Sequence, residues 1–515
     1  MRHAVLPKTL HVDEPTPHVD WSSGAVALLT EPVAWKANGH PRRAAVSSFG
    51  VSGTNAHVII EEPEEAPGGE PGPGVAPTAV PWLVSARSEP ALRAQAARLA
   101  DFVSAGAAEI TDIGYTLVTN RGALSHRAAV VGADLDSLVR SLGELAAGEP
   151  GPGVVVGPAL GSASGKVAFV FPGQGSQWAG MAAGLLADSP VFAASIDECA
   201  AALAPFVDWD LRAALADPAM LDRVDVVQPA LFAVMVSLAA VWRHHGVHPD
   251  AVVGHSQGEI AAAYVAGALS LEDAARVVAL RSKALVALAG AGAMLSVAAP
   301  VDDVRSWLDG HDEVAIAAVN GPSSVVVAGA TAAVEAFQET LTVRTKRIAV
   351  DYASHSPQVE AIAAELATLL AAVRPRQAEV AWYSTVESRW IDGTGADADY
   401  WYRNLRNTVW FAPATEALLG EGFRAFVEAS AHPVLTTGIQ ESVDASGATA
   451  LVTGTLRRDE GGADRLLTSL GAAHVHGIPV DWATVFAPGN PAGSTCPRTP
   501  SSAPATGSNP GRRPR

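Results

Sequence analysis

Apolar and polar residues follow two distinct patterns along residues 166–350. Short, unbroken apolar runs bounded by turn residues are typical of buried parallel strands, and they occur at 167–171, 251–253 and 314–319. Between these runs, apolar residues recur with helical spacing, which predicts helices at 228–244, 258–268 and 272–288. Strands that alternate with helices indicate an α/β fold built on a parallel sheet.

A second pattern interrupts the first within residues 294–350. Short strand patterns occur there at 294–298, 325–328 and 345–350. Helix patterns separate them at 301–308 and 332–341. This order predicts a small α+β subdomain inserted into the larger one.

The segment before residue 166 predicts a separate, smaller α/β unit. Its strand patterns cover 81–85 and 128–131, and its helix patterns cover 92–103 and 134–147. Pro- and Gly-rich stretches at 63–78 and 148–165 flank it and are typical of linkers. The last stretch, 490–515, is rich in Pro, Ser, Gly and Arg and has no periodicity.

Composition limits the function classes. The chain has 515 residues, 49% hydrophobic and 17% charged, which is typical of about two to four folded domains. Its formal net charge of -18 argues against a nucleic-acid partner. Two cysteines, Cys199 and Cys496, predict neither a disulfide framework nor a Cys-based metal site, as in a cytoplasmic protein. Apolar runs such as 230–242 fall short of the roughly 20 residues of a membrane span, so no membrane association is expected.

Residues 254–258, Gly-His-Ser-Gln-Gly, carry the strongest chemical signal. They fit the pattern G-x-S-x-G and lie between a strand pattern and a helix pattern. A turn of this kind lifts a serine hydroxyl above the sheet, and its glycines allow the close approach of the helix. The helix N-terminus supplies free N–H groups that suit a developing oxyanion. We therefore predict that Ser256 is a nucleophile; a Gly-rich turn without function is the alternative.

A nucleophilic serine needs a base, and the chain offers 15 histidines. His355 follows the last strand pattern of the small subdomain, where a surface histidine is equally common. His255 is expected to point away from Ser256 and to have a structural role.

Further polar residues lie near the predicted carboxyl edge of the sheet. The loop 172–177, Pro-Gly-Gln-Gly-Ser-Gln, lacks the nucleotide-binding patterns, and we expect it to offer a second N–H donor to an oxyanion. Arg281 lies in a helix pattern, and from that position alone its side chain is predicted to face solvent. Gln228 is followed by Pro229, and a polar residue followed by proline is common at the start of a helix. Its position therefore needs no functional explanation.

Together these segments resemble one family, the acyltransferase domains of modular type I polyketide synthases. The resemblance covers about residues 166–465 in the expected order. The matching segments are 169–178, 228–231, 254–258, 281–283, 293–294, 320–322 and 352–356. It implies a large hydrolase-like parallel-sheet subdomain with a nucleophile elbow and a small ferredoxin-like α+β subdomain, at about 294–357.

The resemblance implies a Ser256–His355 dyad, in which a backbone carbonyl rather than an Asp orients the histidine. Backbone N–H groups of Gln174 and Gln257 would form the oxyanion hole. Arg281 would pair with the free carboxylate of a dicarboxylic extender unit, which an arginine fork binds better than a lysine. The substrate would be an acyl-CoA and the acceptor the phosphopantetheine thiol of an acyl carrier protein. No metal and no cofactor bound by this domain is implied.

The resemblance also bears on the extender unit. Residues 352–355 read Tyr-Ala-Ser-His, where malonyl-selective members usually have His-Ala-Phe-His. With Gln257 and the segment 223–228, they are similar to methylmalonyl-selective members. A small Ser354 leaves room for an α-methyl group, which is worth only about 1–3 kcal/mol of discrimination. We expect methylmalonyl-CoA, with ethylmalonyl-CoA or mixed use as the alternative. The expected specificity residues are Gln228, Met294, Asn320, Tyr352, Ala353 and Ser354.

The flanks resemble neighbouring parts of such a synthase. Residues 1–62, with 47–57 as the matching motif, resemble the end of a ketosynthase. Residues 63–165 resemble the ketosynthase–acyltransferase linker domain, and 466–489 the post-acyltransferase linker. The ketosynthase catalytic residues would lie upstream, so no condensing activity is expected, and the remnant should expose apolar surface.

The tail, residues 490–515, departs from the family. Members usually continue with Leu-Pro-Thr-Tyr-Ala-Phe-Gln-Arg and end in Tyr-Trp. Codons for that ending, read one base later, translate to residues 495–508 of this chain. We therefore expect a reading-frame slip near Gly493, which resequencing would test, and no function for Cys496.

Two alternatives remain open. A serine hydrolase or thioesterase shares G-x-S-x-G but normally has an acid between Ser and His, and lacks a carboxylate clamp. An inactive fragment of a broken synthase would leave Ser256 unacylated.

Overall fold

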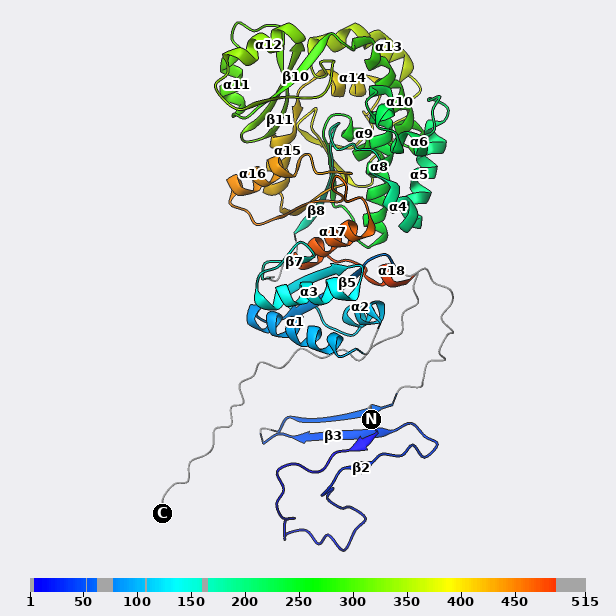
Figure 1. Cartoon of the computed structure of the whole chain (residues 1–515), viewed down its shortest axis with the longest axis vertical. Coiled ribbons are helices and arrows are strands. Elements are labelled where there is room, and N and C mark those ends of the chain that lie inside the picture. The colour runs from blue at the N-terminus through cyan, green and yellow to red at the C-terminus, as the bar shows by residue number, and fades with distance from the viewer. Residues whose placement is uncertain (1–3, 52, 63–76, 107–108, 160–164, 488–515) are drawn as a thin grey trace. The chain divides into compact units, whose positions relative to one another are not determined.

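The computed structural model describes all residues except 1–3, 52, 63–76, 107–108, 160–164 and 488–515. The predicted tail at 490–515, with Cys496, and most of the linker at 63–78 lie outside the described residues. The chain divides into two compact units, Met1–Gly72 and Pro73–Arg515 (Figure 1).

The first unit is built on a hairpin of β3 (Arg43–Phe49) and β4 (Asn55–Glu61), paired in antiparallel register throughout. A short pair, β1 (Val5–Leu6) and β2 (Val33–Ala34), accompanies it. Large apolar side chains of the hairpin, such as Phe49 at 80% and Ile59 at 66%, are exposed. The expected exposure of apolar surface is therefore present.

The second unit contains a six-stranded sheet in the order β15-β14-β9-β8-β17-β18. All neighbours are parallel except the edge pair β14 and β15. The strands are β8 (Lys166–Phe171), β9 (Ala251–Gly254), β14 (Ala381–Ser384), β15 (Arg389–Ile391), β17 (Phe423–Glu428) and β18 (Leu451–Gly454). The predicted α/β fold with a parallel sheet is confirmed.

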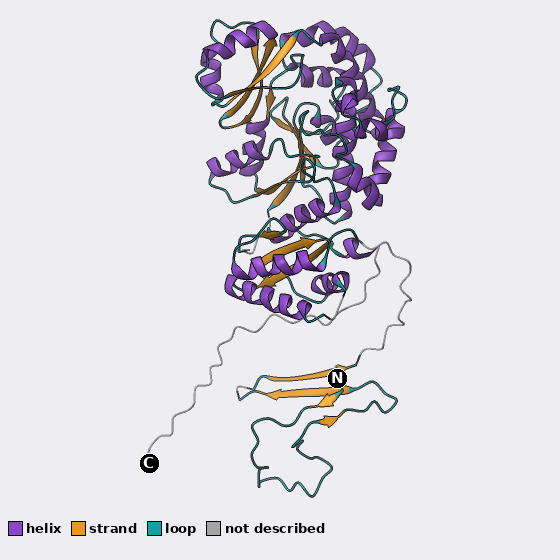
Figure 2. Ribbon diagram, in the orientation of Figure 1, coloured by secondary structure: helices purple, strands orange, loops and turns teal. Residues whose placement is uncertain are grey.

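Both faces of this sheet are buried, which explains the unbroken apolar runs. On β8, Val167 and Phe169 face the core that holds α8 (Val224–His244), and Ala168 and Val170 face the core against α15 (Phe411–Gly420). The layers of helix and sheet are visible in Figure 2. The other elements around this sheet are α4 (Ala183–Asp188), α5 (Pro190–Leu203), α6 (Leu211–Ala216), α7 (Pro218–Leu221), α9 (Gly258–Val265), α10 (Leu271–Leu285), η1 (Val286–Leu288), η2 (Pro357–Ile362), α13 (Ala363–Leu369), α14 (Ala398–Arg406) and α16 (Thr436–Ser446).

The helix α8 is longer than its sequence pattern indicated. It begins at Val224, so Gln228 lies in its second turn and not at its start. Its length and mean hydropathy of 2.0 would suit a membrane span, but 83% of the apolar window is buried inside the protein. The helix is therefore a core element, although its apolar stretch exceeds the expected 230–242.

The small subdomain is a five-stranded sheet in the order β13-β10-β12-β11-β16, with two helices. The elements are β10 (Gly292–Val297), α11 (Val301–Trp307), β11 (Val314–Gly321), β12 (Ser324–Ala330), α12 (Thr331–Thr340), β13 (Thr345–Arg347) and β16 (Val409–Trp410). The run 314–319, expected as a buried parallel strand, forms β11 of this sheet and does not join the large one. It pairs antiparallel with β12 and parallel with the short β16, because a buried apolar run does not identify its partner strand.

The unit before residue 166 has a three-stranded antiparallel sheet, β5-β6-β7. Its elements are β5 (Val80–Ala86), α1 (Glu89–Ser104), α2 (Ile110–Thr119), β6 (His126–Gly132), α3 (Leu135–Ala147) and β7 (Val154–Val156). The C-terminal helices α17 (Ala463–Val475) and α18 (Ala483–Phe486) pack against it, and Phe486 enters its core.

Candidate active site

Ser256 lies on a strained turn between β9 and α9. Its φ of 54° is in the left-handed region, which a residue with a Cβ rarely adopts. A Cβ on Gly254 would come within 2.2 Å of the Glu259 Cα, and one on Gly258 within 2.2 Å of the Phe171 carbonyl oxygen. Only glycine fits at both positions, so the turn requires the Gly-x-Ser-x-Gly pattern.

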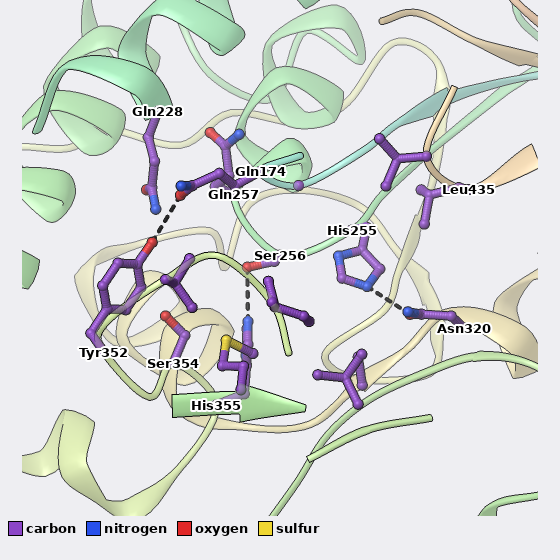
Figure 3. A pocket seen from close by; sticks show the side chains of 17 residues that line it. Gln174, Gln228, His255, Ser256, Gln257, Asn320, Tyr352, Ser354, His355 and Leu435 are labelled. Carbon is purple, nitrogen blue, oxygen red and sulfur yellow. Dashed lines mark hydrogen bonds between the residues drawn. The ribbon is translucent and has the colours of Figure 1, made fainter. Parts of the chain in front are cut away.

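His355 lies opposite this turn, on the segment that leaves the small subdomain. The Ser256 Oγ and the His355 Nε2 are 2.8 Å apart (Figure 3). The His355 Nδ1 is 2.8 Å from the Asn407 carbonyl oxygen. Because a carbonyl only accepts, Nδ1 carries the proton, and Nε2 is free to accept the hydrogen bond of Ser256.

The imidazole of His355 is 4% exposed. Burial, followed by the positive charge of Arg281, lowers the pKa of His355 to about 3. The histidine is therefore neutral near pH 7, as a base that takes the serine proton must be.

Gln174 and Gln257 flank the Ser256 hydroxyl. Gln174 follows β8, and Gln257 is the residue before α9. Within the described residues, no hydrogen bond is donated by either backbone N–H. Two unused N–H groups, one at a helix N-terminus, can stabilise a developing oxyanion. The side chain of Gln174 accepts a 2.8 Å hydrogen bond from the Tyr352 hydroxyl.

Arg281 is on α10 and is 1% exposed, so the assignment to solvent was wrong. Its guanidinium donates to two neutral oxygens, Gln228 Oε1 at 3.4 Å and Asn404 Oδ1 at 3.2 Å. No carboxylate of the described residues lies within ion-pair distance of it. Burial lowers the pKa of Arg281 to about 10, so it remains charged at neutral pH.

The pocket around Ser256 has a volume of about 150 Å³. It is polar on the side of the turn and apolar on the side of the small subdomain. Its lining includes Gln174, Gln228, His255, Ser256, Gln257, Met294, Ala318, Asn320, Val326, Ile348, Val350, Tyr352, Ser354 and His355. The structure thus brings together most of the residues that the sequence singles out.

Two of the predicted pocket residues do not line it. Arg281 is hydrogen-bonded to Gln228, whose side chain reaches the pocket (Figure 3). Ala353 is buried beside Gly292, where an added Cβ would come 2.4 Å from the Ala353 nitrogen. His255 also lines the pocket, and its ring is directed toward Asn320 rather than Ser256, with its Nε2 2.8 Å from Asn320 Oδ1 (Figure 3).

Sequence reasoning missed three residues that support the site. Asn407 offers the carbonyl oxygen to His355, Asn404 contacts Arg281, and Glu259 is a fully buried carboxyl on α9. Of these three, only Glu259 could have been found from the sequence, because it is a charged residue in the apolar helix that follows Ser256. Among the residues that the structure describes, no group of His, Cys, Asp and Glu is arranged to hold a metal ion.

Comparison with known families identifies similar proteins. The family described as "Acyl transferase domain" matches residues 168–480, and "Ketoacyl-synthetase C-terminal extension" matches 15–131, across the predicted boundary at 62–63. The chain is 55% identical over 517 residues to polyketide synthase GfsB of Streptomyces halstedii. That match covers 94% of this chain but 9% of GfsB.

Comparison with solved structures points to the same family. The acyltransferase domain from module 8 of the salinomycin polyketide synthase superimposes with a TM-score of 0.76 at 55% identity, covering 79% of this chain and 98% of that one. The acyl transferase domain of SpnD, solved in complex with 2-(pent-4-yn-1-yl)malonyl, does so with a TM-score of 0.70 at 31% identity, covering 78% and 97%.

Proposed function

The chain belongs to the acyl transferase domain family of modular polyketide synthases, and from this membership we propose that it transfers an extender unit from coenzyme A, through an ester on Ser256, to the phosphopantetheine thiol of an acyl carrier protein. The observation that carries the mechanism is the 2.8 Å contact between Ser256 Oγ and His355 Nε2. The flanking segments, 1–62, 63–165 and 466–489, would connect the acyltransferase domain at 166–465 to neighbouring synthase domains. We place this assembly in the cytoplasm.

In the first half-reaction, Ser256 Oγ attacks the thioester carbonyl carbon while its proton moves to His355 Nε2. The N–H groups of Gln174 and Gln257 stabilise the resulting oxyanion. The carbon–sulfur bond then breaks, and His355 returns the proton to the leaving coenzyme A sulfur. The carrier thiol reacts with the acyl-serine by the same steps in reverse order.

Arg281 supports a dicarboxylic substrate. A buried guanidinium held only by neutral oxygens has lost its hydration without gaining a direct counter-charge, and a substrate carboxylate would supply one. The 3.4 Å contact with Gln228, which lines the pocket, is the bond that such a carboxylate would replace. SpnD, solved with a substituted malonyl group, is consistent with this class of substrate.

We assign methylmalonyl as the preferred extender. Ser354 is buried at the pocket wall, and the apolar side chains of Met294, Val326 and Ile348 face the same space. An α-methyl group would bury apolar surface there, and Ser354 takes up little of the space. Ethylmalonyl is the alternative extender.

The test is intact-protein mass spectrometry after mixing with malonyl-, methylmalonyl- and ethylmalonyl-CoA in competition. We expect one acyl adduct on Ser256, chiefly methylmalonyl, that is lost when holo carrier protein is added. Rapid release of coenzyme A without carrier protein would indicate a hydrolase. A chain that forms no adduct with any of the three would overturn the proposal.

A further inference from the structure

Asn404, on α14, contacts three residues of the site that lie 123 to 148 positions before it in the chain. Its Oδ1 accepts from an Arg281 terminal nitrogen at 3.2 Å. Its Nδ2 donates to Glu259 Oε2 at 2.7 Å and to the Ser256 carbonyl oxygen at 3.2 Å. Asn404 is fully buried, so water does not compete for these hydrogen bonds.

The chemistry of the partners determines how the amide is oriented. An arginine only donates, so it must face the oxygen of Asn404. A carbonyl only accepts, and an ionised carboxylate only accepts, so both must face the amide nitrogen. Neither Leu, which makes no hydrogen bond, nor Asp, which accepts on both oxygens when ionised, would serve these partners.

Glu259 is the carboxyl on the other side of the Asn404 amide, and burial raises its pKa to about 7. It is fully buried and accepts from the Tyr400 hydroxyl at 2.8 Å and from the Thr385 backbone N–H at 3.2 Å, besides Asn404. Arg281 and Glu259 are therefore a buried cation and a buried carboxyl, the latter partly ionised near neutral pH, with no ion pair between them. The Asn404 side chain is hydrogen-bonded to both.

Because Arg281 and Glu259 form no ion pair, the guanidinium remains available to bind a substrate carboxylate. A carboxylate in direct contact with a guanidinium occupies its fork with paired, charge-assisted hydrogen bonds. The neutral amide gives Arg281 only one of the weaker bonds, and the Arg281 Nε has no partner within the described residues. The guanidinium can thus still bind a carboxylate, and Glu259, where it is ionised, limits the cost of burying the positive charge.

We propose that Asn404 is a positioning residue that acts as a neutral spacer: it holds Arg281 in place without neutralising it, and it ties that clamp to the carbonyl of the nucleophile Ser256. The same segment holds the base, because Leu405 and Asn407 offer their carbonyl oxygens to the His355 backbone N–H and Nδ1. Residues 404–407 thereby align nucleophile, base and clamp. This inference rests on the proposed transfer of a dicarboxylic acyl group.

The test compares acylation of Ser256 by methylmalonyl-CoA and by propionyl-CoA, which lacks the carboxylate. For Asn404→Asp we expect the ratio of the two kcat/KM values to fall by about 100-fold, because the new carboxylate occupies the Arg281 fork. For Asn404→Ala we expect a fall of about tenfold, since the guanidinium loses one hydrogen bond and its position. The control is Asp399→Ala, an exposed position on the same helix, which should leave the ratio unchanged.

The pH dependence separates positioning from a general loss of structure. The carboxyl introduced by Asn404→Asp would also face Glu259, and two adjacent carboxyls share a proton at low pH. The defect of this variant should therefore grow as pH rises from 6 to 8, whereas that of Asn404→Ala should not.

Equal losses for both substrates, or an unchanged ratio in folded Asn404→Asp and Asn404→Ala variants, would overturn the spacer role. If Asn404→Asp fails to fold, the ratio for Asn404→Ala decides. A wild-type chain that is not acylated at Ser256 by any acyl-CoA would instead refute the proposed function itself.

Discussion

The two walls of the Ser256 pocket are built on different principles. The catalytic wall, made of Gln174, Ser256 and Gln257 of the large subdomain, is held by glycine contacts, a positive φ and hydrogen bonds. The apolar wall, made of Met294, Ala318, Val326, Ile348 and Val350, belongs to the small subdomain, whose backbone is joined by strand hydrogen bonds, and its side chains meet the pocket only through apolar contacts. Chemistry demands donors placed within fractions of an ångström. Selection of one methyl group involves little free energy and depends on the shape of the wall.

The largest effect is expected from Gly258→Ala in the catalytic wall. Its Cβ would meet the backbone oxygens of Phe171 at 2.2 Å and Pro172 at 2.3 Å, neither of which can rotate away. We expect a loss of about 3 kcal/mol in the free energy of unfolding and about 100-fold in acylation rate. Denaturant unfolding and single-turnover acylation measure the two losses.

Gly143→Ala is the matched control for Gly258→Ala. Gly143 lies in α3 with nothing within 4 Å of the added Cβ. Alanine there should stabilise the protein by about 0.5–1 kcal/mol and leave acylation unchanged. Similar behaviour of the two variants would mean that the turn tolerates displacement.

The next effect concerns pH. A histidine with an ordinary pKa of about 6.5 would lose about 30-fold of its neutral form between pH 8 and pH 5. Because the pKa of His355 is lowered to about 3, the base stays neutral across this range. We expect the rate of acylation by propionyl-CoA to fall by less than about threefold, with recovery on return to pH 8 as the control.

Arg281→Ala sharpens this pH test. Removal of the nearby positive charge raises the pKa of His355, so the acid limb of the rate profile should move toward neutral pH. Burial is the larger cause, so the limb should stay below pH 6.5. A wild-type limb near pH 6.5 would contradict the buried, neutral base.

Ser354→Phe tests the residue that lies between the walls. A phenyl ring in place of the small serine side chain would fill space next to Ser256. The ratio of methylmalonyl to malonyl adducts should therefore fall by about tenfold, while malonyl transfer persists. Competition mass spectrometry measures the ratio, and Ser354→Ala should leave it nearly unchanged. An unaltered ratio in Ser354→Phe would place the selective contact elsewhere.

The smallest effect is expected in the apolar wall. Val326→Ala enlarges the pocket, and we expect the ratio of ethylmalonyl to methylmalonyl adducts to rise by about threefold. Val325→Ala is the matched control, because Val325 lies on the same strand but faces the other core of the small subdomain. Both variants should lose about 2 kcal/mol of stability, but only Val326→Ala should change the ratio. A change of the ratio in both would show that selection is not local to this wall.

The sequence predicted the local elements well, because each depends on neighbouring residues. The apolar runs at 167–171 and 251–253 became parallel strands, and the helix patterns became α8, α9 and α10. The pattern Gly-x-Ser-x-Gly determined the turn of Ser256, since only glycine fits at Gly254 and Gly258. The family, too, followed from the ordered motifs.

Only the tertiary structure decided which distant residues meet. The run at 314–319 joined the small sheet, because burial in a sequence pattern does not specify a partner strand. Arg281 became a buried cation through contacts with Gln228 and Asn404, which lie 53 and 123 residues away along the chain. The carbonyl oxygen of Asn407 is common to every residue type, so no pattern could assign it to His355. Spacing along the chain thus determined the turn that presents Ser256, whereas packing between elements decided what orients His355 and Arg281.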